Sequence, residues 1–267
     1  AAKINEITEL KGRLSSKEPN LQNIPMRMEL GRLIRKVFVP KAGYIFMDAD
    51  YSQIELRLLA HFSQDSNLLE SFIYDKDIHL ETAIKIFGEA EAKEKRNIAK
   101  SINFGLIYGM GAKKLAQTLK ISQSKSKEYI DSYFESFPTV RDYLQKEENF
   151  ILDNGYALTL LGRSRNFDFN NVAEYEKLAF LREGINSIFQ GSAADLIKLS
   201  MNKCFDRFKD RDIKLLLQVH DELIFEVKDT QVDSVSKEIL EIMNNIYTLR
   251  VPLKCGISVG KRWSELK

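Results

Sequence analysis

The chain has 267 residues, 44% of them hydrophobic, and its 40 Lys and Arg residues nearly balance its 38 Asp and Glu residues. This length and composition allow one substantial core or two abutting subdomains, and they exclude an intrinsically disordered chain. The net charge of +2 does not by itself indicate a nucleic-acid partner.

The cysteines and the apolar runs exclude further classes. Cys204 and Cys255 lie alone in the sequence, so they predict neither a zinc site nor a disulfide framework, and we expect a reducing, intracellular compartment. No apolar run approaches the roughly 18 residues of a membrane helix, and the first residues do not resemble a signal peptide. We expect no membrane partner. Because the chain begins at Ala1, we also expect a fragment of a longer protein.

The first half of the chain changes from extended segments to helices. Residues 11–28 are rich in Gly, Ser, Asn and Pro and predict an extended loop. Strands are predicted at 37–39 and 44–50, and a helix is predicted to begin at Gln53. Helical periodicity then dominates from residue 65 to about 150. Breaks are predicted near 75–77, 88, 105–111 and 136–138.

The second half returns to strands. A hairpin is predicted around 157–166, and two helices follow at about 172–188 and 191–209. Strands are then predicted at 213–219, 222–227 and 253–259, with a helix at about 230–246. Because strand-forming segments from both ends of the chain flank a helical middle, we predict an α+β fold in which a sheet platform carries a helical lobe.

Asp50, at the end of the second predicted strand, is the first candidate metal ligand. The two-residue period of a strand places it on the same face as Asp48. An ionised carboxylate on an apolar strand is costly unless it is paired or binds a cation. Mg²⁺ is commonly held by one or two carboxylates, with water and substrate phosphates completing its shell. The alternative is a solvent-facing strand end. Just beyond it, Ser52 and Glu55 match a helix-capping box.

Arg96, Lys100, Phe104 and Tyr108 recur at intervals of four residues and form one stripe along a predicted helix. The stripe would be about 18 Å long, with two cations at one end and two aromatic rings at the other. Arg can bind phosphates bidentately and Lys acts as a point charge. The stripe therefore fits a nucleotide, and its alternative interpretation is an ordinary amphipathic helix.

Asp221 is the second candidate metal ligand. It lies with His220 and Glu222 in a short polar break between two apolar segments, which predicts a hairpin tip. If this tip reaches the strand that ends at Asp50, the two carboxylates make a site for two cations about 3.5–4 Å apart, as phosphoryl-transfer enzymes use. Without cations, the carboxylates would repel each other. The alternative is a polar turn with no ligand.

Three motifs resemble those of the family A DNA polymerases, in the family's order. They are DYSQIELR from Asp50, the run R-x-x-x-K-x-x-x-F-G-x-x-Y-G from Arg96, and VHDE around Asp221. GRLSS, NLQNIP, DIHLETA and QGSAADLIK also match, so the resemblance covers essentially the whole chain. It implies a template-directed DNA polymerase that transfers a nucleotide from a dNTP to a primer 3′-hydroxyl and releases pyrophosphate.

The resemblance also implies a division into subdomains. Residues 1–64 would form the first part of the palm with an N-terminal DNA-contacting loop, 65–185 mainly helical fingers, and 186–267 the second part of the palm. The palm would be built on an antiparallel sheet. We expect this chain to contain neither a thumb nor an exonuclease domain.

Individual roles follow from the same resemblance. Asp50, the carbonyl of Tyr51 and Asp221 would hold two Mg²⁺ ions, for which Mn²⁺ can substitute, with Glu222 in an ancillary position. Asp50, Asp221 and Lys100 would be catalytic. The incoming dNTP would contact Gln53, Glu55, His79, Arg96, Lys100, Phe104 and Tyr108, with Glu55 as the barrier to a ribose 2′-hydroxyl. The primer–template duplex would contact Arg13, Asn20, Gln22, Asn23, Asn186, Gln190 and His220.

The resemblance implies a monomer at the bacterial nucleoid, and an organellar origin stays open. Asp48 departs from the family, which has a small or apolar residue there, and we interpret it as a spectator, with a third metal ligand as the alternative. The sequence leaves two alternatives to a DNA polymerase. The isolated chain could bind primer–template and nucleotide with little turnover. The second alternative is a metal-dependent phosphodiesterase that uses the same two aspartates, but such an enzyme would not require the stripe from Arg96 to Tyr108.

Overall fold

The structure, a computed structural model, describes residues 3–5, 12–25 and 28–266. The chain divides into two compact units. The sheet unit comprises residues 1–54, 193–248 and 253–267, and the helical unit comprises residues 55–192 and 249–252. The predicted assignment of segments to palm and fingers stays a prediction.

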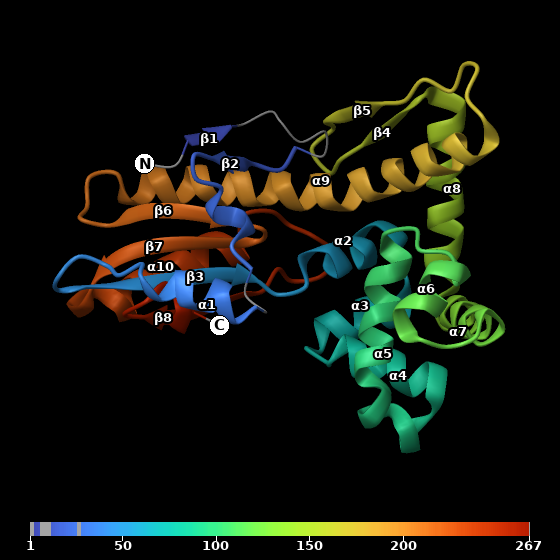
Figure 1. The fold of residues 1–267 in the computed structure, drawn as a ribbon, viewed down its shortest axis with the longest axis horizontal. Coiled ribbons are helices and arrows are strands. Elements are labelled where there is room, and N and C mark those ends of the chain that lie inside the picture. The colour runs from blue at the N-terminus through green and yellow to red at the C-terminus, as the bar shows by residue number, and fades with distance from the viewer. Residues whose placement is uncertain (1–2, 6–11, 26–27, 267) are drawn as a thin grey trace. The chain divides into compact units, whose positions relative to one another are not determined.

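The sheet unit is built on a four-stranded antiparallel sheet in the order β6-β7-β3-β8 (Figure 1). Together with the helices of the other unit, this sheet confirms the predicted α+β class. The elements of the sheet unit are β1 (Lys3–Asn5), β2 (Ser15–Lys17), the 3₁₀ turn η1 (Leu21–Asn23), α1 (Glu29–Lys36), β3 (Tyr44–Tyr51), β6 (Lys214–Val219), β7 (Glu222–Lys228), η2 (Asp229–Gln231), α10 (Val232–Asn244), β8 (Cys255–Gly260) and η3 (Trp263–Glu265).

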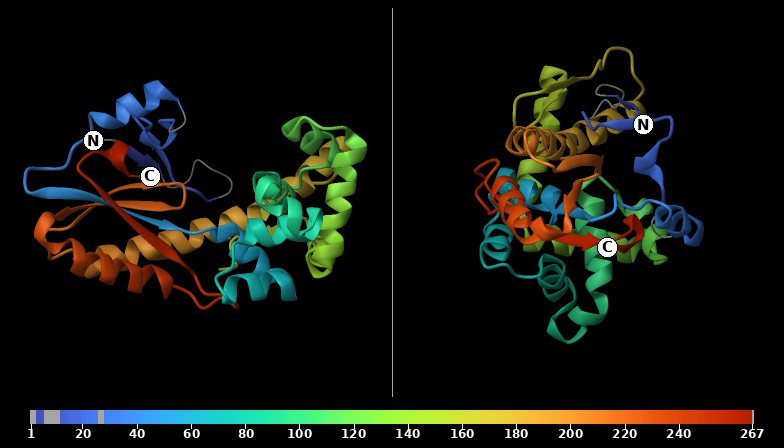
Figure 2. Two further views of the ribbon diagram at one scale, coloured as in Figure 1. Left: turned by 90° about the horizontal axis from the view of Figure 1, so that it is seen from below. Right: turned by 90° about the vertical axis from the view of Figure 1, so that its left-hand side faces the viewer.

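The central strand β3 is covered on both faces. Met47 faces α10, where the Ser236 hydroxyl lies 3.7 Å from its sulfur. On the opposite face, Phe46 packs in a buried cluster with Ile224 and Trp263. The two views of Figure 2 show α1 and α10 on opposite sides of the sheet. A strand covered on both faces favours an apolar sequence, which makes a charged residue within it unusual.

The segment before β3 differs from the prediction. Residues 37–39 are not a strand, and Val37 and Val39 are exposed. They follow α1, a helix that the sequence did not predict. Its buried face consists of Gly31 and Arg35 rather than apolar side chains. Arg35 lies 4.3 Å from the centre of the Trp263 ring. Hydrophobic periodicity therefore could not indicate this helix.

The helical unit confirms the predicted helical region and its breaks near 75–77, 88 and 136–138. The break predicted at 105–111 begins only after Ile107, and the break at 120–122, between α6 and α7, was not predicted. Its helices are α2 (Ile54–Ser63, whose first residue belongs to the sheet unit), α3 (Ser66–Ile73), α4 (Ile78–Phe87), α5 (Glu89–Ile107), α6 (Ala112–Leu119), α7 (Gln123–Ser136) and α8 (Pro138–Asn154). β4 (Tyr156–Leu158) and β5 (Ser164–Asn166) form the predicted hairpin. α4 and α5 pack closely because their contact is lined by Ala83, Ala92 and Ala99.

The two helices predicted between residues 172 and 209 are one helix, α9 (Glu174–Phe208), which has residues in both units. The predicted break was placed before Gly191. A glycine inside a helix costs only about 1 kcal/mol relative to alanine, and the residues around Gly191 are buried. Packing therefore overrides the weak local propensity.

In the part of the chain that the structure describes, no helix has the length and apolar character needed to cross a membrane.

The loop predicted at 11–28 is largely irregular where the structure describes it, although β2 and η1 lie within it. Residues 11, 26 and 27 lie outside the described residues. Hydrogen bonds made by side chains hold the described part of this loop in place. The backbone N–H of Ser16 donates to Gln22 Oε1 at 3.1 Å, and the Ser16 hydroxyl donates to Asn20 Oδ1 at 3.1 Å.

Asp65 should contribute more to the stability of the helical unit than an ordinary helix cap. Its Oδ1 accepts from the backbone N–H groups of Asn67 and Leu68, and its buried Oδ2 accepts from the Thr139 hydroxyl at 2.7 Å. We expect Asp65→Ala to lower the free energy of unfolding by about 2–3 kcal/mol, because a cap and a buried partner are lost together.

Ser122→Ala is the matched control, since Ser122 caps α7 through a single bond to Lys125 N. We expect this variant to cost about 1 kcal/mol or less. Denaturant unfolding of both variants measures the difference, and equal losses would contradict the role given to Thr139.

Candidate active site

The sheet unit brings the two predicted carboxylates together. β6 ends at Val219 and β7 begins at Glu222, so His220 and Asp221 form the predicted hairpin tip. β3 pairs with β7 so that Asp50 lies opposite Glu222. The backbone N–H of Tyr51 then donates to the carbonyl of Asp221 at 3.2 Å. Asp50 and Asp221, which are 171 residues apart in sequence, therefore lie at the same edge of the sheet.

The surroundings of Asp221 disfavour its charged form. Burial and the negative charge of Asp50 raise the pKa of its carboxyl group above the ordinary value, while Arg13 and His220 act in the opposite direction. Two carboxylates that share a half-buried site are stabilised by a cation bound between them. The electrostatics of this edge therefore favour cation binding.

The donor set at this edge fits a hard divalent cation. The described residues contain no cluster of three or more His, Cys, Asp and Glu side chains that could hold a metal ion. Mg²⁺ does not need such a cluster, because it is usually bound by one or two carboxylates together with water and substrate phosphates. Asp50, Asp221 and the carbonyl of Tyr51 supply oxygen atoms of the kind it prefers.

Tyr51 is fixed in place below this edge. Its hydroxyl group donates to the carbonyl of Met243 at 2.7 Å and lies 2.8 Å from the Ser200 hydroxyl. Burial raises the pKa of this hydroxyl group well above its ordinary value, so it keeps its proton and remains a donor. The end of β3 is thereby held against α10 and α9.

Asp48 is almost completely buried on β3. The Ser258 hydroxyl donates to its Oδ2 at 3.4 Å, and its negative charge acts on Arg35. These protein partners agree with a structural role for Asp48, which stays a prediction.

Several predicted DNA-contacting residues lie in the same unit as the carboxylate pair. Gln22 Nε2 donates to the carbonyl and to the side-chain oxygen of Gln218 on β6, at 2.9 and 3.0 Å. Gln218 in turn donates to the carbonyl of His220. The chain of bonds links the loop of Gln22 to the hairpin tip. Asn20, Asn23 and His220 are exposed, as contact with a large ligand requires.

The predicted stripe lies on the helical unit. Arg96, Lys100 and Phe104 are on α5, and Tyr108 is its C-terminal capping residue. The rings of Phe104 and Tyr108 stack with centroids 6.5 Å apart and an angle of 22° between their planes. Lys100 is exposed. The order of two cations and then two aromatic rings along one helix is as predicted.

Asp77, which the sequence did not single out, holds Arg96. Its Oδ1 caps α4 by accepting from the backbone N–H groups of His79 and Leu80, and its Oδ2 accepts from Arg96 Nε at 2.6 Å. An Asp directly before the first residue of a helical segment is a preferred N-cap and could have indicated this residue. This bond uses Nε and does not involve the two terminal guanidinium nitrogens of Arg96.

His79 is buried at the contact between α4 and α5, 5.6 Å from the ring centre of Phe104. Burial and the positive charges of Arg96 and Lys100 lower the pKa of its imidazole to about 4, although Asp77 acts in the opposite direction. The side chain is therefore neutral near pH 7.

Glu55 and Tyr108 are joined in the helical unit. The Tyr108 hydroxyl donates to Glu55 Oε2 at 2.5 Å. This bond positions a carboxylate beside the aromatic end of the stripe.

Farther along the chain, Asn186 and Gln190 lie on α9, and Asn186 Oδ1 is buried without a hydrogen-bond partner among the described residues.

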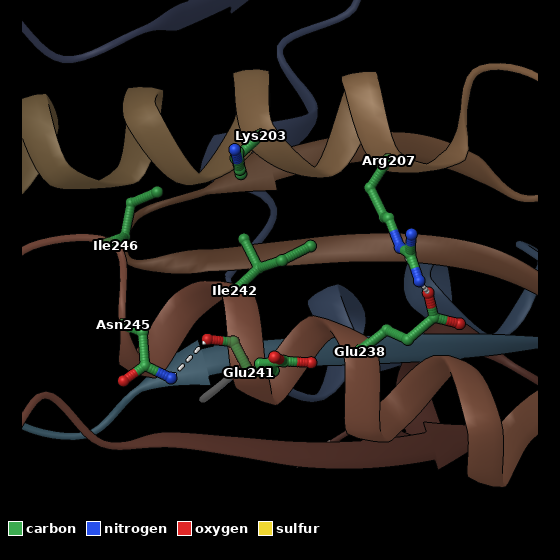
Figure 3. Close-up of a pocket in the computed structure, with 7 residues that line it drawn as sticks. All are labelled: Lys203, Arg207, Glu238, Glu241, Ile242, Asn245 and Ile246. Atoms are coloured by element: carbon green, nitrogen blue, oxygen red, sulfur yellow. Dashed lines mark hydrogen bonds and ion pairs between the residues drawn. The ribbon is translucent and has the colours of Figure 1, made fainter.

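The sheet unit also has a groove that contains none of the predicted site residues. It has a volume of about 730 Å³ and lies between α9 and α10 (Figure 3). Arg207 and Glu238, which line it from opposite sides, form an ion pair, since Arg207 Nε donates to Glu238 Oε2 at 2.6 Å. The described residues of the groove include no cluster of three or more metal-ligating side chains, so the pair of Asp50 and Asp221 remains the candidate site.

Comparisons with known proteins agree with one another. The model of DNA polymerase family A matches residues 1–265. DNA polymerase I of Helicobacter pylori is 56% identical over 259 residues, which are 96% of this chain and 29% of that protein. DNA polymerase I of Borreliella burgdorferi is 47% identical over 262 residues, again 96% of this chain and 29% of that protein. This chain therefore spans less than a third of the length of these curated relatives.

A solved structure is also similar. It is the POL domain of Pol1 from M. smegmatis, in complex with DNA primer-template and dNTP. The two chains are 40% identical in sequence and superpose with a TM-score of 0.94, and the match covers 99% of this chain and 48% of that chain.

The raised pKa of Asp221 makes the charged carboxylate a destabilising group in the cation-free protein. When the folded state has the higher pKa, stability falls as pH rises above the ordinary value of about 4 and stays lower beyond the folded pKa. We expect Asp221→Asn to raise the melting temperature at pH 7 in EDTA by about 2–4 °C, which corresponds to about 1 kcal/mol in a domain of this size.

Asp212→Asn should have the opposite effect. The hydroxyl group of Tyr44 and the ammonium group of Lys228 lower the pKa of Asp212, so its charge stabilises the fold above the ordinary pKa. Thermal unfolding at pH 7 compares the two variants. A lower melting temperature for Asp221→Asn would show that burial does not penalise this carboxylate.

Proposed function

The chain belongs to DNA polymerase family A, as its motifs predict, and on this premise we propose that it carries the nucleotidyl-transfer site of a template-directed DNA polymerase. The observation that carries the proposal is the meeting of Asp50 with the hairpin tip of Asp221 at one edge of the sheet. The product would be a primer longer by one nucleotide, with pyrophosphate released from the dNTP.

Asp50, Asp221 and the carbonyl of Tyr51 would hold two Mg²⁺ ions, or Mn²⁺ in their place. Bound there, the ions would lower the pKa of the primer 3′-hydroxyl and neutralise charge on the triphosphate. Tyr51 contributes rigidity, because its hydroxyl group is bonded to Met243 and close to Ser200. Glu222, opposite Asp50 in the strand register, is an ancillary carboxylate.

The cationic end of the stripe would bind the triphosphate. Arg96 is oriented by Asp77, so its terminal nitrogens are available as a bidentate fork for phosphate oxygens. Lys100 adds an exposed point charge. It would also be positioned to stabilise the pyrophosphate as it leaves, or to donate a proton to it.

The aromatic end would bind the base and sugar. Phe104 and Tyr108 present stacked rings, and flat rings can stack on any base, which suits a polymerase that accepts four nucleotides. Glu55, bonded to the Tyr108 hydroxyl, would exclude a ribose 2′-hydroxyl group. Gln53 would contribute a further polar contact to the nucleotide. Phe104 in place of Tyr implies discrimination against nucleotides that lack a 3′-hydroxyl.

Primer–template DNA would be read mainly through its shape. The proposed contacts are neutral amides and basic side chains, which suit the acceptor groups of the minor groove. They are Arg13, Asn20, Gln22, Asn23, Asn186, Gln190 and His220. We also propose that the protein acts as a monomer on the DNA of a bacterial cell, in keeping with its bacterial relatives.

A second candidate function is binding of primer–template and nucleotide with little turnover. The observation that favours it is length, because the chain spans 29% of the relatives named above. Phosphate contacts supply much of the affinity of DNA-binding proteins, and those relatives have more chain with which to make them. Measuring DNA binding and primer extension on the same preparation separates the two functions.

Primer extension with Mg²⁺ tests the proposed reaction. We expect Asp50→Asn and Asp221→Asn to reduce extension by more than roughly 100-fold, which exceeds the typical cost of losing an outer partner of a metal site. Asp48→Asn is the matched control, since it lies on the same strand face and should keep most of the activity.

Two outcomes would contradict this assignment. Normal extension by Asp50→Asn would remove the carboxylate pair from the mechanism. A loss in Asp48→Asn as severe as in Asp50→Asn, with folding intact, would make Asp48 a part of the metal site instead of a spectator.

A further inference from the structure

A chain of hydrogen bonds buried between α4 and α5 ends on His79. Thr82 and Asn103 are completely buried, and His79 is 2% exposed. The Thr82 hydroxyl lies 2.7 Å from the carbonyl of Ile78. Asn103 Nδ2 lies 3.0 Å from the Thr82 hydroxyl and 3.1 Å from His79 Nδ1, and Asn103 Oδ1 lies 3.2 Å from the same hydroxyl. Buried polar groups of this kind are costly unless every donor meets an acceptor, so the protons in the chain can be assigned in order.

The order begins at Ile78, whose carbonyl can only accept. The Thr82 hydroxyl has a single proton, and the carbonyl of Ile78 at 2.7 Å is a closer acceptor for it than Asn103 Oδ1 at 3.2 Å. Thr82 Oγ1 then accepts from Asn103. Of the two amide atoms, Nδ2 is the nearer to Thr82 Oγ1, at 3.0 Å against 3.2 Å for Oδ1, and it is also the atom that lies beside His79 Nδ1. The second proton of that amide nitrogen is then directed at His79 Nδ1, which must be an acceptor.

A neutral imidazole has one N–H group and one acceptor nitrogen. If Nδ1 accepts from Asn103, the proton of His79 is on Nε2. None of the described residues forms a hydrogen bond with His79 Nε2. We infer that Thr82 and Asn103 are positioning residues that fix His79 as the Nε2–H tautomer, so that it presents a hydrogen-bond donor to the triphosphate of the incoming nucleotide.

The inference rests on the proposed function for its ligand, and it deepens that function in one respect. A phosphate oxygen can only accept, so the other tautomer would present a lone pair to it and repel it. Selecting the tautomer in advance removes the cost of selecting it when the nucleotide binds. Thr82 and Asn103 need not touch the nucleotide to have this effect.

The charges around His79 explain why a tautomer, rather than a positive charge, would be used. Arg96 and Lys100 on α5 face it, Asp77 lies at the N-terminal cap of α4, and burial adds to the effect of the two cations. Burial and these two cations lower the pKa of the imidazole to about 4, so the ring is neutral near pH 7. His79 would then add a directional hydrogen bond between two cations without adding a third charge.

The test is a pair of variants at Thr82, read by ¹⁵N NMR of the histidine rings. The chain has three His residues, so the signals are few, and those of His79 are identified by their loss in His79→Gln. In the wild type near pH 7 we expect Nε2 protonated and Nδ1 unprotonated, without nucleotide.

Thr82→Val removes the hydroxyl group at nearly constant volume, which frees the Asn103 amide to turn its oxygen toward His79. We expect this variant to populate the Nδ1–H tautomer. Thr82→Ser keeps a hydroxyl group and should retain the wild-type tautomer. Circular dichroism checks that both variants remain folded.

Nucleotide kinetics supply the functional readout. We expect Thr82→Val to raise KM for dNTP roughly tenfold, the size of one lost hydrogen bond to a charged group, with a smaller change in kcat. Thr82→Ser should stay within about twofold of the wild type. A structural defect alone would not move the ¹⁵N signals of His79 and KM together and spare the serine variant.

The outcomes separate this inference from the proposed function. An Nδ1–H tautomer in the wild type, or an unchanged tautomer and KM in Thr82→Val, would overturn the inference while primer extension by the wild type still supported a polymerase. A wild type that binds DNA but does not extend primers would refute the proposed function. The NMR spectra would then still decide whether Thr82 and Asn103 fix the tautomer.

Discussion

The backbone bond from Tyr51 to the carbonyl of Asp221 joins the two segments on which the candidate site depends. β3 and the β6–β7 hairpin are distant in sequence, and either could carry an acidic residue for ordinary reasons. Antiparallel pairing sets their register, and a shift of one residue would turn every side chain of β3 to the opposite face. The register of β3 against β7 therefore determines where Asp50 lies, because it places Asp50 opposite Glu222, next to the hairpin tip.

In the helical unit, close packing of α4 against α5 likewise fixes the positions of polar side chains. Alanine side chains at the contact of α4 and α5 let the helix backbones approach closely. The space left is small enough to exclude water and large enough for one row of polar side chains, Thr82, Asn103 and His79. Polar groups in such a space have few allowed arrangements, because each unsatisfied donor or acceptor costs free energy. Close packing thus orders side chains that would be mobile on a surface.

Sequence reasoning predicted most elements and the main site residues, and its errors have physical causes. Breaks at Gly88 and Pro138 were predictable because those residues limit the backbone itself. The stripe from Arg96 to Tyr108 was predictable because helical spacing is regular. By contrast, α1 buries Gly31 and Arg35, and α9 continues past Gly191 because its neighbours are buried. Both cases depend on tertiary contacts, which local patterns do not contain.

The partners of the site residues were harder to predict than the residues themselves. Asp77, Thr82 and Asn103 form hydrogen bonds to side chains that are 19 to 24 residues away in the sequence. Neither charge nor periodicity distinguishes them from other polar residues on α4 and α5. Their positions become meaningful only when the two helices are packed and the donors and acceptors can be matched.

α1 buries a glycine and an arginine and exposes its leucines, and this arrangement limits which of its residues can change during evolution. Its apolar residues Leu30 and Leu33 face outward, so replacing them disturbs no core. Gly31 has no such freedom, since a methyl group built on it would overlap the carbonyl oxygen of Pro25, at 1.8 Å. In homologous sequences, we expect the apolar residues at positions 30 and 33 to vary and the glycine at position 31 to be retained. This reverses the usual relation, in which apolar residues are the more constrained.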